Sequence, residues 1–194
     1  MHYSLTYERD HEAGLWTLAV TVLWPSCQAQ AQGSGARCSG SQSSMNEAFA
    51  KAAITLRSKT PIPLRLPTCV LGLHSEEGPY AIVKSADESG YVVVLGATPD
   101  CQGQHACSYG TMIGTSRPLD RIDEYDVTRR PRSAVRLRGG LKGYFYPPVC
   151  GVYCSDSFIT WTEGTYHYMI GLKAETRPSL LASANSAIES AGAK

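Results

Sequence analysis

The cysteines constrain this chain more than any other feature of its sequence. There are seven, an odd number that leaves one thiol over if the rest are paired in disulfides. Cleavage after Ala31 would remove Cys27 and leave an even set. The six that remain are Cys38, Cys69, Cys101, Cys107, Cys150 and Cys154. Such a set predicts three disulfide bonds, an oxidising compartment and a small exported domain.

Residues 15–24 form an uncharged apolar run, which Pro25 and Ser26 end. Ala29-Gln30-Ala31 then supplies the small residues that a signal peptidase recognises. The run is too short to cross a hydrocarbon core of roughly 30 Å as a helix. We therefore predict a signal peptide over residues 1–31. Its acidic start is unusual for a signal peptide, and the alternative is a buried N-terminal helix of a cytosolic protein. Lipidation at Cys27 is disfavoured by the residues before it.

The composition after Ala31 suits one ordinary folded domain. Because residues 1–31 contain three acidic residues and one basic residue, their removal raises the formal net charge from +1 to +3. This even balance argues against a nucleic-acid partner or an anionic surface. The segment 117–138 contains several arginines, but acidic residues lie among them. We interpret it as a solvated, charged loop and not as a binding patch.

Residues 32–42 are rich in Gly, Ser and Gln and predict a flexible leader to a single domain over residues 43–194. A helix is expected from Ser44, because Ser44 and Glu47 have the spacing of a capping box. Pro61 should end it. The following segment, 61–67, contains three prolines, which confine it to an edge strand or an extended polyproline segment.

The apolar period then changes to two, which predicts strands. The expected strands cover residues 80–85, 91–96, 109–115, 135–138, 141–146, 158–162 and 165–173. A closing helix should begin at an N-cap on Thr176, with Pro178 in its first turn. We predict an α+β fold in which a mainly antiparallel sheet of six to seven strands carries an N-terminal and a C-terminal helix.

Sequence proximity suggests the disulfide pairs Cys101–Cys107 and Cys150–Cys154, each closing a short loop between strands. Elimination then pairs Cys38 with Cys69, although six cysteines allow fifteen connectivities. One alternative is a metal site formed by Cys101, His105 and Cys107, but this spacing matches no standard zinc motif. Another is a redox-active Cys150/Cys154 pair, which lacks the two-residue spacing of thioredoxin-like motifs.

The sequence contains no recognisable catalytic motif, neither Gly-x-Ser-x-Gly nor His-Glu-x-x-His. His74, His105 and His167 are scattered, and each is expected at the surface of a loop or strand. We therefore predict no catalytic residue, no metal and no cofactor.

Aromatic side chains on the last strands are the candidate binding residues. Tyr144 and Tyr146 share one face of a strand, and Trp161, Tyr166 and Tyr168 belong to the next hairpin. Such residues can stack on sugars or anchor an interface. The favoured alternative is that Trp161, Tyr166 and Tyr168 pack beneath the C-terminal helix.

Two cysteine-bearing motifs support a family resemblance. They are Thr98-Pro99-Asp100-Cys101-x5-Cys107-x2-Gly110 and Gly143-Tyr144-Phe145-x4-Cys150-Gly151-x2-Cys154-x6-Trp161-x4-Tyr166. With the terminal Ala184-Asn185-Ser186-Ala187-Ile188, the chain resembles uncharacterised exported proteins of cyanobacteria over residues 63–188. This resemblance implies export and cross-links but no mechanism. The order of elements is more loosely similar to the extracytoplasmic domains of bacterial anti-sigma factors, and fold alone does not give function.

The sequence thus favours a non-enzymatic protein of the periplasm or thylakoid lumen, which binds a protein partner or supports a membrane assembly. After cleavage it would not itself span the membrane. The alternative is a hydrolase acting on cell-wall or polysaccharide material.

Overall fold

The computed structural model describes residues 42–71, 79–119, 130–173 and 175–190, all within one compact unit. The predicted signal peptide and nearly all of the predicted leader lie outside these residues. In chain order the elements are α1 (Gln42–Arg57), β1 (Tyr80–Asp87), β2 (Gly90–Gly96), β3 (Ser108–Thr115), β4 (Ser133–Arg136), the 3-10 turn η2 (Arg138–Gly140), β5 (Lys142–Tyr146), β6 (Asp156–Glu163), β7 (Tyr166–Lys173) and α2 (Arg177–Ser190).

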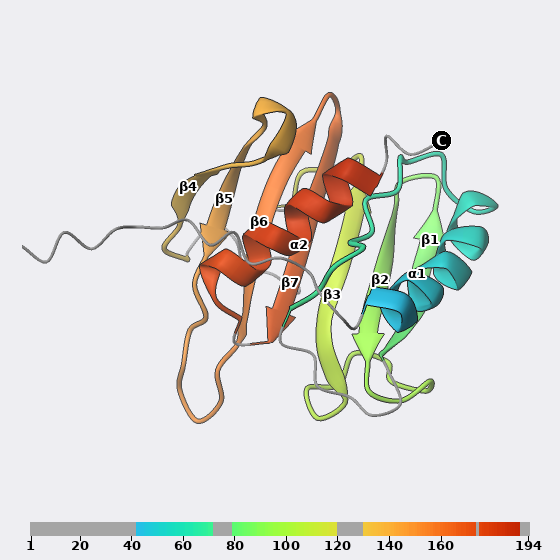
Figure 1. The fold of residues 1–194 in the computed structure, drawn as a ribbon, viewed down its shortest axis with the longest axis horizontal. Helices are drawn as coiled ribbons and strands as arrows, with labels where there is room; N and C mark the ends of the chain where they lie inside the picture. Colours follow the sequence, from blue (N-terminus) through green and yellow to red (C-terminus); the bar gives the residue numbers. More distant parts are fainter. Residues whose placement is uncertain (1–41, 72–78, 120–129, 174, 191–194) are drawn as a thin grey trace, which may run out of the picture. The chain divides into compact units, whose positions relative to one another are not determined.

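The strands form one seven-stranded sheet in the order β1-β2-β3-β7-β6-β5-β4 (Figure 1). Every neighbouring pair is antiparallel. The predicted α+β class with a helix at each end is confirmed. The pairing of β3 with β7 places the last hairpin in the middle of the sheet and joins its two halves.

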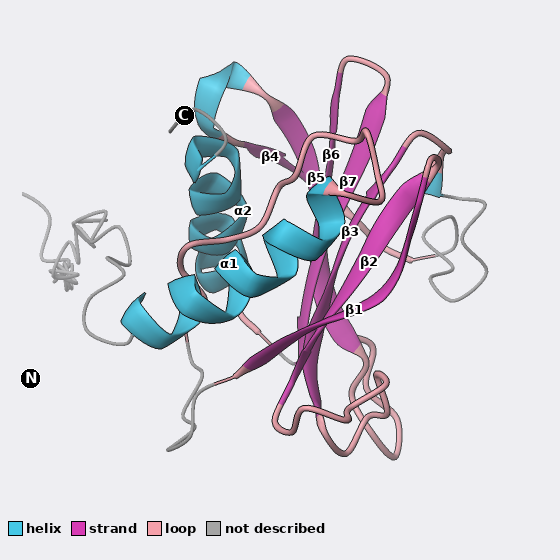
Figure 2. Cartoon of the chain, turned by 90° about the vertical axis from the view of Figure 1, so that its right-hand side faces the viewer, coloured by secondary structure: helices cyan, strands magenta, loops and turns pink. Residues whose placement is uncertain are grey.

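Both helices pack on one face of the sheet, as Figure 2 shows from the side. Helix α1 contacts β1, and α2 contacts β6 and β7. Helix α2 begins as predicted, because the Thr176 hydroxyl accepts a hydrogen bond from the Ser179 amide. Helix α1 begins at Gln42, two residues before the predicted cap. The main core lies between helices and sheet and includes Phe49, Leu56, Val93, Leu95, Met112, Ile159, Ile170, Leu172, Leu180 and Ala184.

The proline segment, residues 61–67, runs as an extended chain between the two helices (Figure 1). It forms no strand, so the edge-strand alternative is wrong. Its backbone groups bond to side chains instead of a neighbouring strand: Tyr168 donates to the Pro63 carbonyl, and Ser190 donates to the Leu66 carbonyl. These bonds replace the ladder that proline cannot complete.

The two predicted hairpins are confirmed. At the β1–β2 turn, the Asp87 carboxylate accepts hydrogen bonds from the amides of Ser89 and Gly90 at 2.7 and 3.1 Å. At the β6–β7 turn, Gly164 has a φ of 59°, a conformation that glycine adopts without steric cost. Tight local turns of this kind fix the register of the strands that they join.

The opposite face of the sheet carries no helix among the described residues, and a smaller apolar cluster covers part of it. Its members are Ile113, Tyr146, Phe158 and Met169, with Val92 and Leu119 packed beside them. Tyr146 stacks on Phe158 with ring centroids 4.4 Å apart. This helix-free face also carries the loops that contain the disulfides.

Candidate functional site

Two of the three predicted disulfides lie within the described residues. Cys101 is bonded to Cys107, and Cys150 is bonded to Cys154. The metal alternative at the first pair is therefore wrong, because its sulfur atoms are bonded to each other. Cys69 also takes part in a disulfide, and its predicted partner, Cys38, lies outside the described residues.

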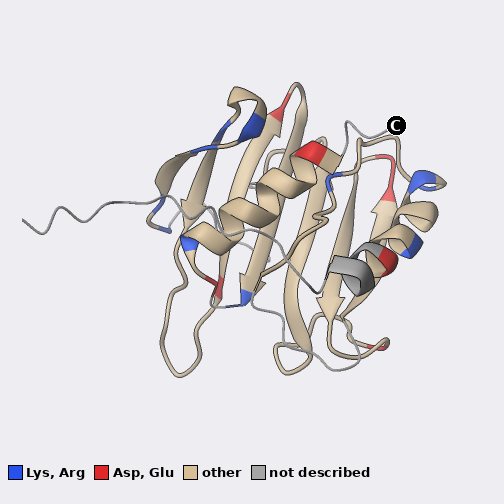
Figure 3. Ribbon diagram, viewed as in Figure 1, with Lys and Arg blue, Asp and Glu red and all other residues tan. Residues whose placement is uncertain are grey.

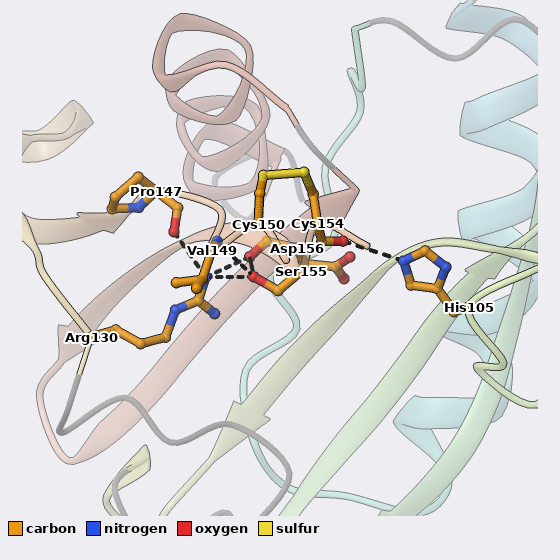
Figure 4. Close-up of a disulfide and its surroundings, with 8 residues drawn as sticks. All are labelled: His105, Arg130, Pro147, Val149, Cys150, Cys154, Ser155 and Asp156. Carbon is orange, nitrogen blue, oxygen red and sulfur yellow. Dashed lines mark hydrogen bonds between the residues drawn. A yellow bond between two sulfur atoms is a disulfide. The ribbon is translucent and has the colours of Figure 1, made fainter. Parts of the chain in front are cut away.

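Residues 147–155 form a loop that we name the apolar loop, and Arg130 holds its base (Figure 4). One guanidinium nitrogen of Arg130 donates to the Pro147 carbonyl, the Ser155 hydroxyl and the Asp156 carbonyl at 2.8–2.9 Å. The guanidinium also lies 4.5 Å from the centre of the Phe158 ring. Burial lowers the pKa of Arg130. These contacts fix both ends of the loop to the sheet.

Further bonds close the apolar loop on itself. The Ser155 hydroxyl accepts from the Val149 amide at 3.0 Å, and the Ser155 amide donates back to the Val149 carbonyl at 2.9 Å. The disulfide between Cys150 and Cys154 bridges the tip. The loop is therefore a turn that a disulfide and two hydrogen bonds close on itself.

The tip of the apolar loop exposes large hydrophobic side chains. The exposed fractions are 52% for Val149, 92% for Val152 and 76% for Tyr153. Only two other large hydrophobic residues within the described ranges are exposed, Ile54 on α1 and Tyr144 on β5. Concentration of such residues in one rigid loop is typical of an interaction surface.

A pocket of about 200 Å³ lies on the helix-free face beside this loop. We name it the polar pocket. Strands β1, β2, β3 and β6 and the loop between Cys101 and Cys107 contribute its lining, which consists of Lys84, Val92, Val94, Gly103, His105, Ser108, Thr111 and Asp156. The cross-linked loop brings Gly103 and His105 over the sheet.

His105 connects the polar pocket to the apolar loop. Its Nε2 lies 3.3 Å from the Cys154 carbonyl oxygen, and its ring lies 5.8 Å from that of Tyr153. Lys173 on β7 donates to the His105 carbonyl oxygen. Figure 4 shows Asp156 on the side of the disulfide that faces His105. The two disulfide-closed loops therefore contact each other over the end of the sheet.

Asp156 is the only acidic residue that lines the polar pocket within the described part of the chain. Burial raises the pKa of its carboxyl group, and the positive charges of His105, Lys173 and Arg130 oppose that shift without cancelling it. A carboxyl group in this state can exchange a proton or accept hydrogen bonds from a ligand.

The predicted aromatic residues do not form one site, because strand register separates them onto two faces. Trp161 pairs with Gly143 and Tyr168 in the sheet and is 3% exposed beneath the helices. Its ring stacks on Tyr168 at 5.3 Å, and Tyr166 packs against the same core. The favoured alternative for these three residues, packing beneath the C-terminal helix, matches their positions.

Tyr144 and Tyr146 lie on the helix-free face, but only Tyr144 is exposed there, at 41%. Tyr146 is 2% exposed because it stacks on Phe158. The two tyrosines share one face as predicted, but only Tyr144 is accessible to a partner. Arg132 lies 4.4 Å above the Tyr144 ring, a cation–π contact.

The arginine-rich segment also differs from its prediction where it is described. Figure 3 shows basic residues, coloured blue on the ribbon, along β4 and η2, in keeping with a charged surface. Arg130, however, is half-buried and forms the base of the apolar loop, so the interpretation as a solvated loop is wrong for this residue. No local pattern distinguishes Arg130 from its neighbours, since its acceptors lie 17 to 26 residues further along the chain.

A half-buried ion pair on the other face was not predicted from the sequence. Arg65 in the proline segment bonds to both carboxylate oxygens of Glu163, and the Trp161 indole donates to the same carboxylate at 2.7 Å. The Arg65 amide donates to the Tyr91 hydroxyl at 2.9 Å. We name these four residues the latch. These bonds connect the proline segment to β2 and to the last hairpin, which gives the latch a structural role.

Among the described residues, no cluster of His, Cys, Asp or Glu could hold a metal ion. No helix in those same ranges has the length and apolarity needed to cross a membrane. The sequence matches no protein-family model, no curated protein and no solved structure. Functional inference therefore depends on the apolar loop and the polar pocket.

Proposed function

We propose that this chain is an exported, non-enzymatic protein that binds a protein partner through the apolar loop. The observation that carries the proposal is the exposure of Val149, Val152 and Tyr153 on one cross-linked turn. Tyrosine is enriched among the residues that dominate binding energy at protein interfaces. A loop already fixed by a disulfide and by Arg130 loses little conformational entropy when it binds.

The disulfides support the proposal that the protein is exported. Bonds of this kind form and persist in oxidising compartments, which include the periplasm and other extracytoplasmic spaces. The resemblance to exported cyanobacterial proteins supports the periplasm or the thylakoid lumen in particular. We accordingly expect the partner to be a component of the cell envelope or of a membrane assembly.

A capture experiment with paired variants tests this function. The oxidised protein is used as bait for solubilised membrane proteins, beside a Val152→Gln/Tyr153→Ser double variant and an Ile54→Gln control. Ile54 is 69% exposed on α1, so the control removes an exposed apolar side chain elsewhere on the surface. We expect the double variant to lose the partner and the control to retain it. Equal capture by all three proteins would contradict the proposal.

The hydrolase alternative gains support from one observation, the raised pKa of Asp156, which is a common property of general acids. Glycoside hydrolysis ordinarily uses two carboxyl groups, and Asp156 is the single one lining the pocket within the described residues. We therefore rank this alternative second. Turnover of wall polymers that is lost in Asp156→Asn would reverse the ranking.

A further inference from the structure

The polar pocket has a lining that the proposed protein interface does not use. Its base includes the apolar side chains Val92 and Val94 and the side chain of Thr111, a residue that is 6% exposed. Lys84 and His105 stand at its exposed rim, and Asp156 contributes a carboxyl group from β6. Polar groups that converge on a small concave surface with an apolar patch are the usual composition of a ligand site.

The Asp156 carboxyl group makes no hydrogen bond or ion pair with any described residue, although its backbone carbonyl accepts from Arg130. The positive groups His105, Lys173 and Arg130 influence it from further away. A partly buried carboxyl group without a donor gains free energy when a ligand supplies one.

The charges around the pocket restrict the ligand that can supply this donor. A cationic ligand would be repelled by the positive charges of His105, Lys173 and Arg130. An anionic ligand would be repelled by Asp156 at short range. A neutral hydroxyl group meets both requirements, because it carries no charge and can donate a hydrogen bond to the Asp156 carboxylate while it accepts one from the Thr111 hydroxyl.

The size and shape of the polar pocket further restrict the chemical class of the ligand. A volume of about 200 Å³ is below that of drug-sized sites and suits a single ring. Val92 and Val94 can pack against the C–H face of such a ring, while its hydroxyl groups reach Asp156 and Thr111. We propose that the polar pocket binds one neutral pyranose unit, either a free monosaccharide or the end of a glycan.

Two glycines keep space open around this site. A Cβ atom at Gly103 would lie 3.5 Å from Val94 and 3.9 Å from the Lys84 Nζ. A Cβ atom at Gly171 would lie 3.8 Å from an Asp156 carboxylate oxygen. Longer side chains at these positions would extend toward the groups that we assign to the ligand. Gly103 also has a φ of 96°, which strongly favours glycine.

The test compares pyranose rings that differ in charge. Methyl glycosides of glucose, galactose, mannose and N-acetylglucosamine are titrated into the oxidised, full-length protein, beside glucuronate and glucosamine. Amide signals of Gly103, His105 and Thr111 are followed by NMR. We expect saturable shifts with at least one neutral glycoside and weaker binding of its charged counterpart. Tighter binding of glucuronate or glucosamine would overturn the proposal. So would no saturable shift up to about 50 mM, which covers millimolar dissociation constants.

Matched variants locate the binding. Asp156→Asn should weaken it by about tenfold or more, since a hydrogen bond to a charged group is lost. Asp100→Asn changes an exposed acid outside the pocket and should leave binding unchanged. Thr111→Val should weaken binding, whereas Thr160→Val, at an equally buried position on the same face, should not. Equal affinity of Asp156→Asn and Thr111→Val with the unchanged protein, at unchanged melting temperature, would show that the sugar binds elsewhere.

Titration with a hexasaccharide of the preferred sugar distinguishes a glycan end from a free monosaccharide as the ligand. Binding as tight as that of the monosaccharide assigns the site to a glycan end, and much weaker binding assigns it to a free sugar. The result is independent of the proposed protein interface, because Val152→Gln/Tyr153→Ser should retain sugar binding while it loses the partner.

Discussion

At the scale of single residues, the Glu163 carboxylate accepts hydrogen bonds from two side chains that lie far apart in the sequence, Arg65 in the proline segment and Trp161 on β6. The Glu163 side chain is 19% exposed. Burial by itself would raise its pKa, but the bonds from Arg65 and Trp161 and the charge of Arg65 outweigh burial and lower it. The latch thereby connects the proline segment to the last hairpin through an ionised carboxylate.

The lowered pKa gives Glu163 a pH-dependent contribution to stability. The contribution is complete above the ordinary value of 4.5 and is lost as the pH falls through the lower folded value. We expect Glu163→Gln to destabilise the fold by about 1–3 kcal/mol at neutral pH, because Arg65 keeps a half-buried charge without its partner. Urea unfolding between about pH 3 and pH 7 should show this difference shrinking toward the acid end. A difference independent of pH would contradict the ionised latch.

The aromatic residues differ in how much they stabilise the fold. Trp161→Ala removes a side chain that is 3% exposed and should cost about 3–5 kcal/mol. Tyr146→Ala should also be costly, because its ring stacks on Phe158. Tyr144→Ala should cost about 1 kcal/mol or less, since that side chain is 41% exposed. Chemical denaturation of the three variants measures these differences. An unchanged melting temperature for Trp161→Ala, together with loss of partner capture, would instead make Trp161 a binding anchor.

At the scale of elements, the centre of the sheet depends on a close approach between two strands. Gly114 on β3 pairs with Tyr91 on β2, and a Cβ at Gly114 would lie 2.4–2.7 Å from the Tyr91 ring. The ring can therefore lie across the neighbouring strand, where its hydroxyl accepts a hydrogen bond from the Arg65 amide. This packing connects the sheet to the proline segment above it.

Alanine at Gly114 should displace the Tyr91 ring and destabilise the protein by about 1–3 kcal/mol. Gly171→Ala is the matched control, because its Cβ would have only ordinary contacts of 3.5–3.8 Å in the same sheet. Thermal unfolding should separate the two variants clearly. Equal melting temperatures would mean that the Tyr91 ring has room to move, and the latch would then depend less on its position.

At the scale of the whole molecule, the number of cysteines available for disulfides depends on whether the predicted signal peptide is removed. Cleavage after Ala31 leaves six cysteines, and four of these form the two disulfides in the described loops. Each short cross-link should contribute about 2 kcal/mol by limiting the unfolded chain. The oxidised protein should therefore be measurably more stable than the reduced one.

Intact-mass analysis of the exported protein tests this dependence. We expect an N-terminus at Gln32, three disulfides and no thiol that reacts under denaturing conditions. Protein that still begins at Met1, or that titrates with two or more thiols, would contradict both the cleavage and the assignment of Cys38 to Cys69.

Local sequence patterns determined most of the fold. Alternating apolar residues, the turns at Asp87 and Gly164 and the cap at Thr176 predicted the strands, the hairpins and the closing helix, because each signal depends on residues close together in the chain. The two short disulfides were predictable for the same reason. Tertiary structure alone decided which distant residues meet. Pairing of β3 with β7, and the register of β5 against β6, placed Trp161 and Tyr144 on opposite faces. The same arrangement brought Arg65 to Glu163, Arg130 to the apolar loop and Lys84 to the pocket of Asp156, contacts that no local period encodes.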